Sequence, residues 1–172
     1  NSATSYEQLY AVELDGSGNI FILGGTGSSV GGTQGGMGDA FIAKLSATTG
    51  VLDAAFGDGD GINNDGIVQL NNSSTNSASM SDTFLGLALD GVGNIFIAGH
   101  TMSSMGGTNA GLFDIVVAKL DTTSGVLDAA FGDGDGGGGF DNDGVVQLNA
   151  SNTNSATGME QASDVILDGV GK

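Results

Sequence analysis

The chain contains one sequence unit twice. Residues 51–61 recur without change as residues 126–136, so each residue of this segment lies 75 positions before its counterpart. Beyond the acidic segment the offset grows to 78, because Gly137, Gly138 and Gly139 have no counterpart in the first copy. A repeat of this length constrains the fold strongly, since each copy must form the same supersecondary unit and stack on its neighbours.

The duplication divides the chain into three parts. Residues 1–75 form the first repeat, residues 76–153 the second, and residues 154–172 begin a third. The opening Asn1-Ser-Ala-Thr4 reappears 153 positions later as Asn154-Ser-Ala-Thr157. We therefore expect either a piece of a longer array or units that stack on further copies of themselves, within one chain or between chains.

Each copy is expected to form four short strands, because short runs rich in β-branched and aromatic residues alternate with glycine-rich turns. The expected strands are Leu9–Leu14, Asn19–Leu23, Ala40–Leu45, Gly66–Leu70, and in the second copy Phe84–Leu89, Asn94–Ala98, Asp114–Leu120 and Gly144–Leu148. Asp15–Gly18 and Asp90–Gly93 carry the Asp-Gly signal of a hairpin turn. One helical turn is expected at Leu52–Phe56 and at Leu127–Phe131. The predicted fold class is all-β, with tandem four-stranded antiparallel, blade-like repeats, in a β-propeller or an open stack.

One motif pair resembles a known family. Leu14–Thr26 reads LDGSGNIFILGGT and Gly38–Leu45 reads GDAFIAKL, and the second copy carries the same pattern in Leu89–Thr101 and Phe113–Leu120. This pattern resembles the SBBP β-propeller repeat of bacterial proteins. The resemblance implies blade-like sheets and a secreted or cell-surface location. At about 75 residues this repeat is long for a blade, and two blades do not close a ring, which takes roughly four to eight.

The charge balance excludes several classes of function. Three lysines stand against 20 acidic residues, for a formal charge of −17. A nucleic-acid-binding surface needs a cluster of cations to replace the counterions of the phosphate backbone, so we expect no nucleic-acid partner. No apolar stretch is long enough to insert into a membrane. The chain has no cysteine, which excludes disulfides and thiolate chemistry.

Two acidic segments are the best candidates for a metal site. Alternating aspartate and glycine offers carboxylate and carbonyl oxygens on a tight turn, which suits calcium with its six to eight oxygen ligands. Neither segment fits the EF-hand loop, because the distal glutamate is missing. Ordinary turns, in which each aspartate bonds to its own backbone, are the alternative. The candidate calcium ligands are Asp58, Asp60, Asn63, Asp65, Asp133, Asp135, Asp141 and Asp143.

Other polar residues predict structure rather than chemistry. Asp39 and Asp114 stand at equivalent positions, each five residues before a lysine, Lys44 or Lys119, and we expect a structural ion pair in each copy. His100 is the only histidine and is not part of the repeated pattern, so we expect it at the surface or in a loop. No catalytic constellation is apparent, and we expect the chain not to be an enzyme.

These observations favour an extracellular structural or adhesive module, calcium-stiffened, that serves as a stalk, fibre or adhesin segment of a bacterial surface. Its partners would be other copies of the same repeat. The alternative is a ligand-binding propeller segment that recognises surface glycans or proteins through the loops Gly25–Gly38 and Thr101–Gly111. A fragment of a propeller enzyme, with its active site shared by other blades, is a third hypothesis.

Overall fold

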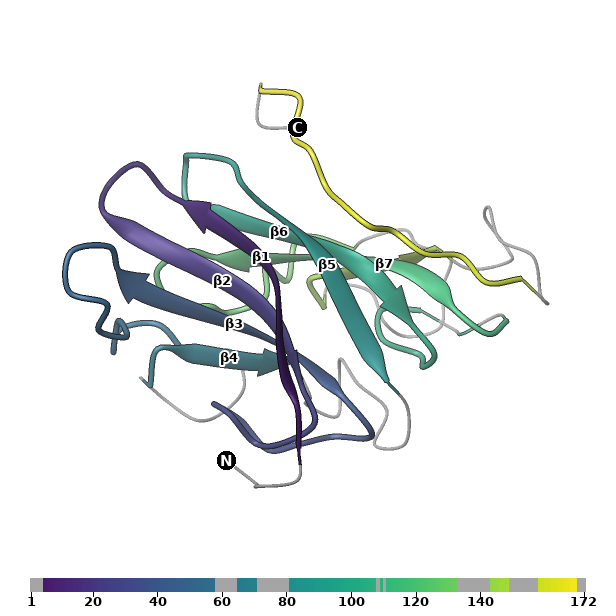
Figure 1. Ribbon diagram of the computed structural model, residues 1–172. Coiled ribbons are helices and arrows are strands. Elements are labelled where there is room, and N and C mark those ends of the chain that lie inside the picture. Colours follow the sequence, from purple (N-terminus) through teal and green to yellow (C-terminus); the bar gives the residue numbers. More distant parts are fainter. Residues whose placement is uncertain are drawn as a thin grey trace.

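The structure is a computed structural model that describes residues 5–57, 65–70, 81–107, 109, 111–132, 143–148 and 158–169. Every regular element in this part of the chain is a strand, which confirms the all-β prediction (Figure 1). The strands are β1 (Glu7–Leu14), β2 (Asn19–Thr26), β3 (Asp39–Ser46), β4 (Ile67–Leu70), β5 (Asp82–Leu89), β6 (Asn94–Thr101), β7 (Asp114–Asp121) and β8 (Val145–Leu148). Within the described ranges no helix is long and apolar enough to cross a membrane.

The eight strands form two antiparallel sheets of four, one from each copy. The strand order is β1-β2-β3-β4 in the first sheet and β5-β6-β7-β8 in the second, so every strand pairs with its neighbour in sequence. Both sheets also share a register shift at the same place, between Leu9 and Ala11 in β1 and between Phe84 and Gly86 in β5. The prediction of four strands per copy is confirmed, and the repeated irregularity in the first strand is an additional feature that the two sheets share.

The hairpin between the first two strands is fixed by an aspartate. Asp15 Oδ1 accepts hydrogen bonds from the backbone N–H of Ser17 at 2.8 Å and of Asn19 at 3.0 Å. Gly16 and Gly18 have φ of 72° and 101°, a region that favours glycine, so the turn needs both. Asp90 makes the equivalent bonds in the second copy. The predicted Asp-Gly hairpins are confirmed.

Each predicted helical turn is reduced to a single hydrogen-bonded turn, and the leucine before it is extended. Leu52 forms an isolated bridge with Leu45, and only one hydrogen-bonded turn follows, closed by the Phe56 N–H and the Asp53 carbonyl at 2.9 Å. Leu127 bridges Leu120 in the same way in the second copy. The backbone is extended at each of these leucines because it pairs with the end of the third strand, which leaves too few residues for a helix.

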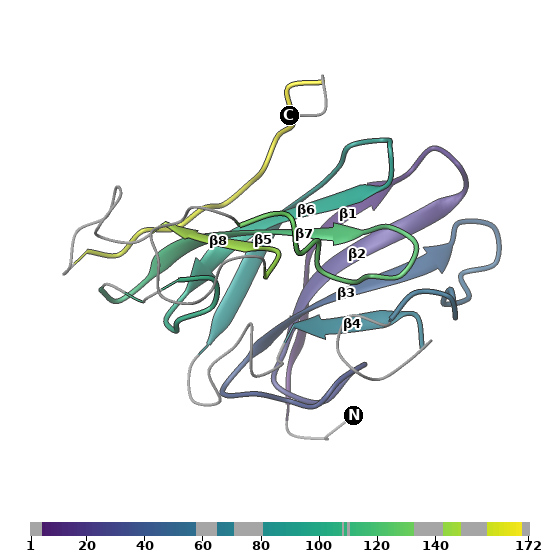
Figure 2. The same cartoon turned by 180° about the vertical axis from the view of Figure 1, so that it is seen from behind.

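The two sheets pack on each other through opposite faces of the repeated unit. We call front face the side of each sheet that carries Phe21 in the first copy and Phe96 in the second, and back face the other side. In the first sheet the front face is buried, as the fully buried side chains of Phe21, Ile42 and Val68 show. In the second sheet the back face is buried, with Ile95 and Ile97 fully covered. Figures 1 and 2 show the sheets as two layers, with β5 against the first sheet.

The same side chain therefore has a different environment in each copy. Phe56 at the edge of the front face is completely buried, whereas its counterpart Phe131 is partly exposed. On the back face the order is reversed, because Ile95 is completely buried and its counterpart Ile20 is partly exposed. Each copy covers one face of its neighbour, whereas no sheet covers the front face of the second sheet or the back face of the first.

The C-terminal segment 158–169 follows the path of a further first strand. Met159 forms a parallel bridge with Phe113, as Ser81 does with Gly38 one copy earlier. The Glu160 N–H donates to the Phe113 carbonyl at 3.1 Å, which repeats the bond from Asp82 to Gly38. In Figure 1 this segment, drawn in yellow, runs beside the second sheet, and its backbone at Val165 lies against Gly86 of β5.

The unequal burial of equivalent phenylalanines predicts unequal effects of truncation. Phe56 meets Phe21 edge to face at 5.9 Å, and Phe131 meets Phe96 in the same way at 6.0 Å. Phe56→Ala should therefore lower the free energy of unfolding by about 3–5 kcal/mol, since it opens a cavity between the sheets. Phe131→Ala should lower the free energy of unfolding by distinctly less, because Phe131 is partly exposed. Urea unfolding curves of the two variants measure the difference, and equal losses would contradict the packing described.

Candidate functional site

A buried polar cluster holds the glycine-rich loop between the second and third strands of each copy. The Gln69 side chain is fully buried, and its Nε2 donates to Asp39 Oδ2 at 2.7 Å and to the Ser28 carbonyl at 3.0 Å. Its Oε1 accepts from the backbone N–H of Val30 and Gly32. One glutamine thus satisfies donors and acceptors on both sides of the loop, as a buried amide requires.

The second copy repeats this cluster. Gln147 Nε2 donates to Asp114 Oδ2 at 2.8 Å and to the Ser103 carbonyl at 3.0 Å, and its Oε1 accepts from the N–H of Met105 at 2.8 Å. Sequence reasoning missed both glutamines. The signal that could have found them is a polar residue inside two otherwise apolar strands, at the same place in Ile67–Leu70 and Val145–Leu148.

A second carboxylate lies near this cluster at the junction between the copies. Asp82, the first residue of β5, is 3% exposed, and its Oδ1 accepts from the hydroxyls of Thr101 and Ser103. Its Oδ2 is buried and has no hydrogen-bond partner among the described residues. Burial raises the pKa of Asp82, the two hydroxyls act to lower it, and the charge of Asp39 adds to the rise, so that the pKa lies at about 6.

The acidic residue recurs at the start of each first strand. Glu7 holds the place of Asp82 in the first copy, where it is exposed and accepts from the Ser28 hydroxyl at 3.0 Å. Glu160 holds the place in the C-terminal segment. Where a preceding copy covers this position, as at Asp82, the carboxylate is buried close to an aspartate of that copy, Asp39. A proton or a small cation at this place would reduce the repulsion between the two carboxylates. Within the described ranges, no group of three or more acidic or histidine side chains is placed to hold a metal ion.

Most of the predicted calcium ligands lie outside the described residues. These are Asp58, Asp60, Asn63, Asp133, Asp135 and Asp141. The two that are described, Asp65 and Asp143, begin the turns before β4 and β8, where each Oδ1 accepts the backbone N–H two residues on, at 2.9 and 2.8 Å. This is the bond of an Asx turn, which the alternative interpretation predicts for these two residues.

The ends of each acidic segment are tied together. The Gly66 N–H donates to the Phe56 carbonyl at 2.8 Å, and Gly144 donates to Phe131 in the second copy at 3.0 Å. A Cβ placed on Gly57 would lie only 2.9 Å from Asp65 Oδ1, so the residues that flank the first segment are in contact. The described residues on either side of each acidic segment therefore lie close together.

The prediction for the lysine partners is wrong. Lys44 forms its salt bridge with Asp53 at 2.8 Å, and Lys119 pairs with Asp128 at 2.6 Å. Five residues along an extended strand span about 16 Å, so Asp39 lies too far along β3 to meet Lys44. Each ammonium also lies over the ring of a phenylalanine of the adjacent strand, at 5.7 Å in the first copy and 5.8 Å in the second.

The prediction for His100 is also wrong. The residue lies in β6 and is 8% exposed, with its ring edge to face against Phe113 at 5.0 Å. Burial lowers the pKa of the imidazole. The counterpart in the first copy is Gly25 of β2, and a Cβ there would approach the Tyr10 ring to 2.9 Å. The second copy therefore fills with a histidine a place where a tyrosine lies in the first.

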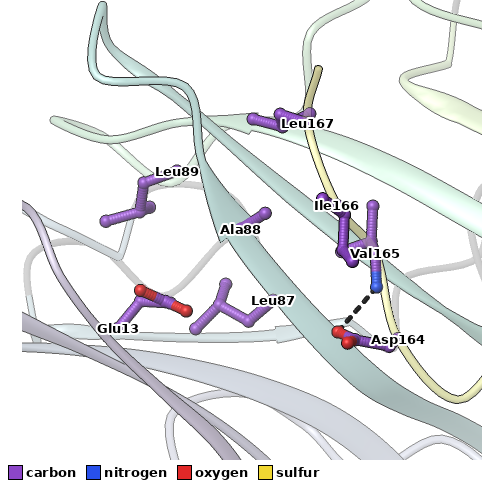
Figure 3. A pocket seen from close by; sticks show the side chains of 8 residues that line it. All are labelled: Glu13, Leu87, Ala88, Leu89, Asp164, Val165, Ile166 and Leu167. Carbon is purple, nitrogen blue, oxygen red and sulfur yellow. Dashed lines mark hydrogen bonds between the residues drawn. The ribbon is translucent and has the colours of Figure 1, made fainter. Parts of the chain in front are cut away.

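An open groove of about 330 Å³ lies between β5 and the C-terminal segment (Figure 3). Its walls come from β5 and the C-terminal segment, and β1 adds Glu13, so the groove follows from the way the copies stack. Asp164 at its border accepts a hydrogen bond from the Val165 N–H at 2.8 Å. The lining residues are Glu13, Leu87, Ala88, Leu89, Asp164, Val165, Ile166 and Leu167.

The raised pKa of Asp82 predicts how stability depends on pH. An aspartate that titrates near 3.8 when unfolded and near 6 when folded favours the folded state only while it is protonated. This contribution is present below about pH 4 and is lost as the pH rises through 6. Asp82→Asn resembles the protonated acid, so it should match the wild type at pH 4 and exceed its free energy of unfolding by about 2–3 kcal/mol at pH 7.

Asp90→Asn is the matched control. Burial acts to raise the pKa of Asp90, but the hydrogen bonds from Asn94 and Val92 outweigh it and lower that pKa. The charged form therefore favours the folded state, and this variant should be less stable than the wild type at pH 7, with a difference that shrinks on acidification. Urea unfolding at several pH values tests both variants. If the difference in free energy of unfolding between variant and wild type changed with pH in the same direction for both, the opposite pKa shifts of Asp82 and Asp90 would be contradicted.

No protein-family model matches this chain, and a search of curated proteins finds no match. The resemblance to the SBBP repeat therefore stays a prediction, and the function must be argued from the geometry of the copies.

Proposed function

We propose that this chain is an extracellular structural or adhesive module whose blade-like sheets stack into a longer array or a head-to-tail fibre. The observation that carries the proposal is the front-to-back packing of the two sheets. A front-to-front contact would cover both like faces and end the stack, as a twofold contact does. A front-to-back contact leaves one face of each kind, so the same step can be repeated.

The arrangement of the first strands supports blades rather than a closed sandwich. β5 contacts β1, β2 and β3 of the first sheet, and the C-terminal segment lies against β5 at Gly86. First strands of successive copies therefore lie next to one another, as the inner strands of neighbouring propeller blades do. The number of copies in the native assembly would decide whether the array closes into a ring or stays open.

Calcium in the acidic segments is part of the proposal. The charge of −17 on a chain with three lysines favours bound cations, since they reduce self-repulsion. The contact between Gly57 and Asp65, which flank the first acidic segment, supports this part of the proposal. In this proposal the metal ions stiffen the turns that follow the third strand of each copy, next to the contact between the sheets. An extracellular location would supply calcium at the concentrations that weak sites need.

Calcium should raise the melting temperature. A site held at a hundredfold excess of ligand over its dissociation constant stabilises the folded state by about 2.7 kcal/mol, which corresponds to several degrees for a chain of this size. Thermal melts followed by circular dichroism in millimolar calcium, in equal magnesium and in EDTA test this expectation. A melting temperature that is the same in calcium and EDTA would show that the acidic segments are ordinary turns.

A chain extended by one more copy should be more stable than residues 1–172 alone. Lys172 takes the place of Asn19, so residues 20–75 can be appended directly after it to complete a third sheet. The added sheet would cover the front face of β5–β8 and bury Phe131, so Phe131→Ala should become as costly in the extended chain as Phe56→Ala is. An extended chain in which Phe131→Ala remains as mild as before would contradict the stacking proposal.

A further inference from the structure

We propose that a second copy of this chain docks the back face of its first sheet onto the front face of the second sheet, repeating between chains the contact that joins the sheets within one chain. This inference rests on the proposed function and names its partner and its two surfaces. The contact is head-to-tail, so it leads to a ring if the rotation closes and to a filament if it does not.

The two faces that no sheet covers carry counterparts of the residues that already pack between the sheets. On the front face of the second sheet the counterparts of the buried Phe21, Ile42, Phe56, Val68 and Leu70 are Phe96, Val117, Phe131, Val146 and Leu148. All five of these counterparts are partly exposed. Continuity with the contact inside the chain therefore selects a second copy as the partner, rather than an unrelated apolar surface.

The back face of the first sheet offers the matching half. The fully buried back-face residues of the second sheet include Ile95, Ile97, Val116, Leu120 and Val145. Their counterparts in the first sheet, all partly exposed, are Ile20, Ile22, Phe41, Leu45 and Ile67. Along β1 the exposure is larger, at 60% for Leu9 and 65% for Leu14, whose counterparts in β5 pack into the core. Docking would remove this surface from water and supply the hydrophobic driving force.

A glycine marks the docking register. Gly125 of the second copy packs against the front face of the first sheet. A Cβ added there would come within 2.4 Å of Val68 Cγ2 and 3.1 Å of the Phe56 ring. Its counterpart Gly50 meets nothing within 4 Å. In a docked second copy, Gly50 would take the place of Gly125, against Val146 and Phe131 of the first chain. Gly50 thus has open space around it in the first copy, whereas Gly125 at the same place in the second copy contacts the neighbouring sheet.

The backbone adds one hydrogen bond to the same contact. The Ser124 carbonyl, next to Gly125, accepts from the Gly57 N–H of the first sheet at 3.0 Å. The corresponding bond between chains would join the Thr49 carbonyl of the docking copy to the Gly132 N–H of the chain that receives it. This bond fixes the distance between the sheets at the edge where the acidic segments begin.

Two features oppose docking and make it dependent on conditions. The segment 158–169 lies where β1 of the incoming copy would lie, so it must leave the second sheet for docking to complete. It is held there by the backbone hydrogen bonds of Gly158 and Glu160 with Leu112 and Phe113, and by its contact with Gly86. Two chains of charge −17 also repel each other, and salt screens this repulsion. Assembly should therefore increase with protein concentration and with ionic strength.

The test compares two glycines that are alike in the free chain. Gly50 and Gly16 have φ of 68° and 72°, and an added Cβ meets nothing within 4 Å at either. Asparagine tolerates this backbone region, so Gly50→Asn and Gly16→Asn should both fold, which circular dichroism verifies. Sedimentation velocity at rising protein concentration in 0.5 M salt should show oligomers for the wild type and for Gly16→Asn. Gly50→Asn should weaken association at least tenfold.

A mixing experiment tests the head-to-tail geometry. Val146→Asp places a charge on the front face of the second sheet, whereas Val92→Asp, at a hairpin tip that is 80% exposed, is its control. Gly50→Asn and Val146→Asp chains should each remain monomeric, and an equal mixture should form a dimer that grows no further, because each partner retains one intact face. A mixture that stays monomeric or forms long assemblies would contradict the geometry.

The outcomes separate this inference from the proposed function. Wild-type chains that stay monomeric at all concentrations and salt conditions, or Gly50→Asn chains that assemble as Gly16→Asn chains do, would overturn docking between chains. If the extended chain nevertheless buries Phe131, the array within one chain would stand and only the inference would fall. If Phe131→Ala is as mild in the extended chain as in the original chain, both the inference and the proposed function would be wrong.

Discussion

The front face of one sheet against the back face of the next is the contact on which the rest of this structure depends. Successive side chains along a strand point to opposite faces of the sheet, so a strand with one solvent-exposed face would alternate between polar and apolar residues. Here the strands β2 and β3 carry apolar side chains on both faces, which suits a sheet with a neighbouring sheet on each side. Ile20 and Phe21 are neighbours in sequence, yet only Phe21 is fully buried, since only its face has a neighbouring sheet.

Polar side chains fix the frame that this apolar contact needs. Asp15 and Asp90 close the hairpins by accepting backbone N–H groups, and Gln69 and Gln147 hold the glycine-rich loops against the sheets. Each of these residues occurs once per copy and makes equivalent bonds in both. Since a buried amide without partners would be costly, the glutamines also specify which loop conformation is compatible with the sheet.

Two buried polar residues of the second copy have no buried polar counterpart in the first. The exposed Glu7 corresponds to the buried Asp82, and Gly25 corresponds to the buried His100. Asp82 faces the preceding copy, and its burial raises its pKa to about 6. The junction between copies is thus the place where protonation or cation binding would act on the stack. Asp65 and Asp143, the described members of the acidic segments, lie elsewhere, at the turns before β4 and β8.

Much of this arrangement follows from the sequence. The duplication, the apolar runs and the Asp-Gly turns predicted eight strands and their hairpins, because these features depend on local backbone preferences and on periodicity. Gln69 and Gln147 could have been found as polar interruptions of apolar strands. The partners of Lys44 and Lys119 could not, since Asp53 and Asp128 reach the lysines only through the turn that follows the third strand. The candidate calcium ligands Asp65 and Asp143 take part in Asx turns, as the alternative interpretation predicts, and the other six lie outside the described residues.

The sequence by itself determined which residues share a face, because alternation in a strand is a local property. Only the tertiary structure decided which of the two faces each copy buries. Ile20 and Ile95 occupy the same position of the same pattern, and so do Phe56 and Phe131, so nothing local distinguishes them. Their burial differs because a sheet covers one member of each pair and no sheet covers the other, and that depends on the packing of one copy against the next.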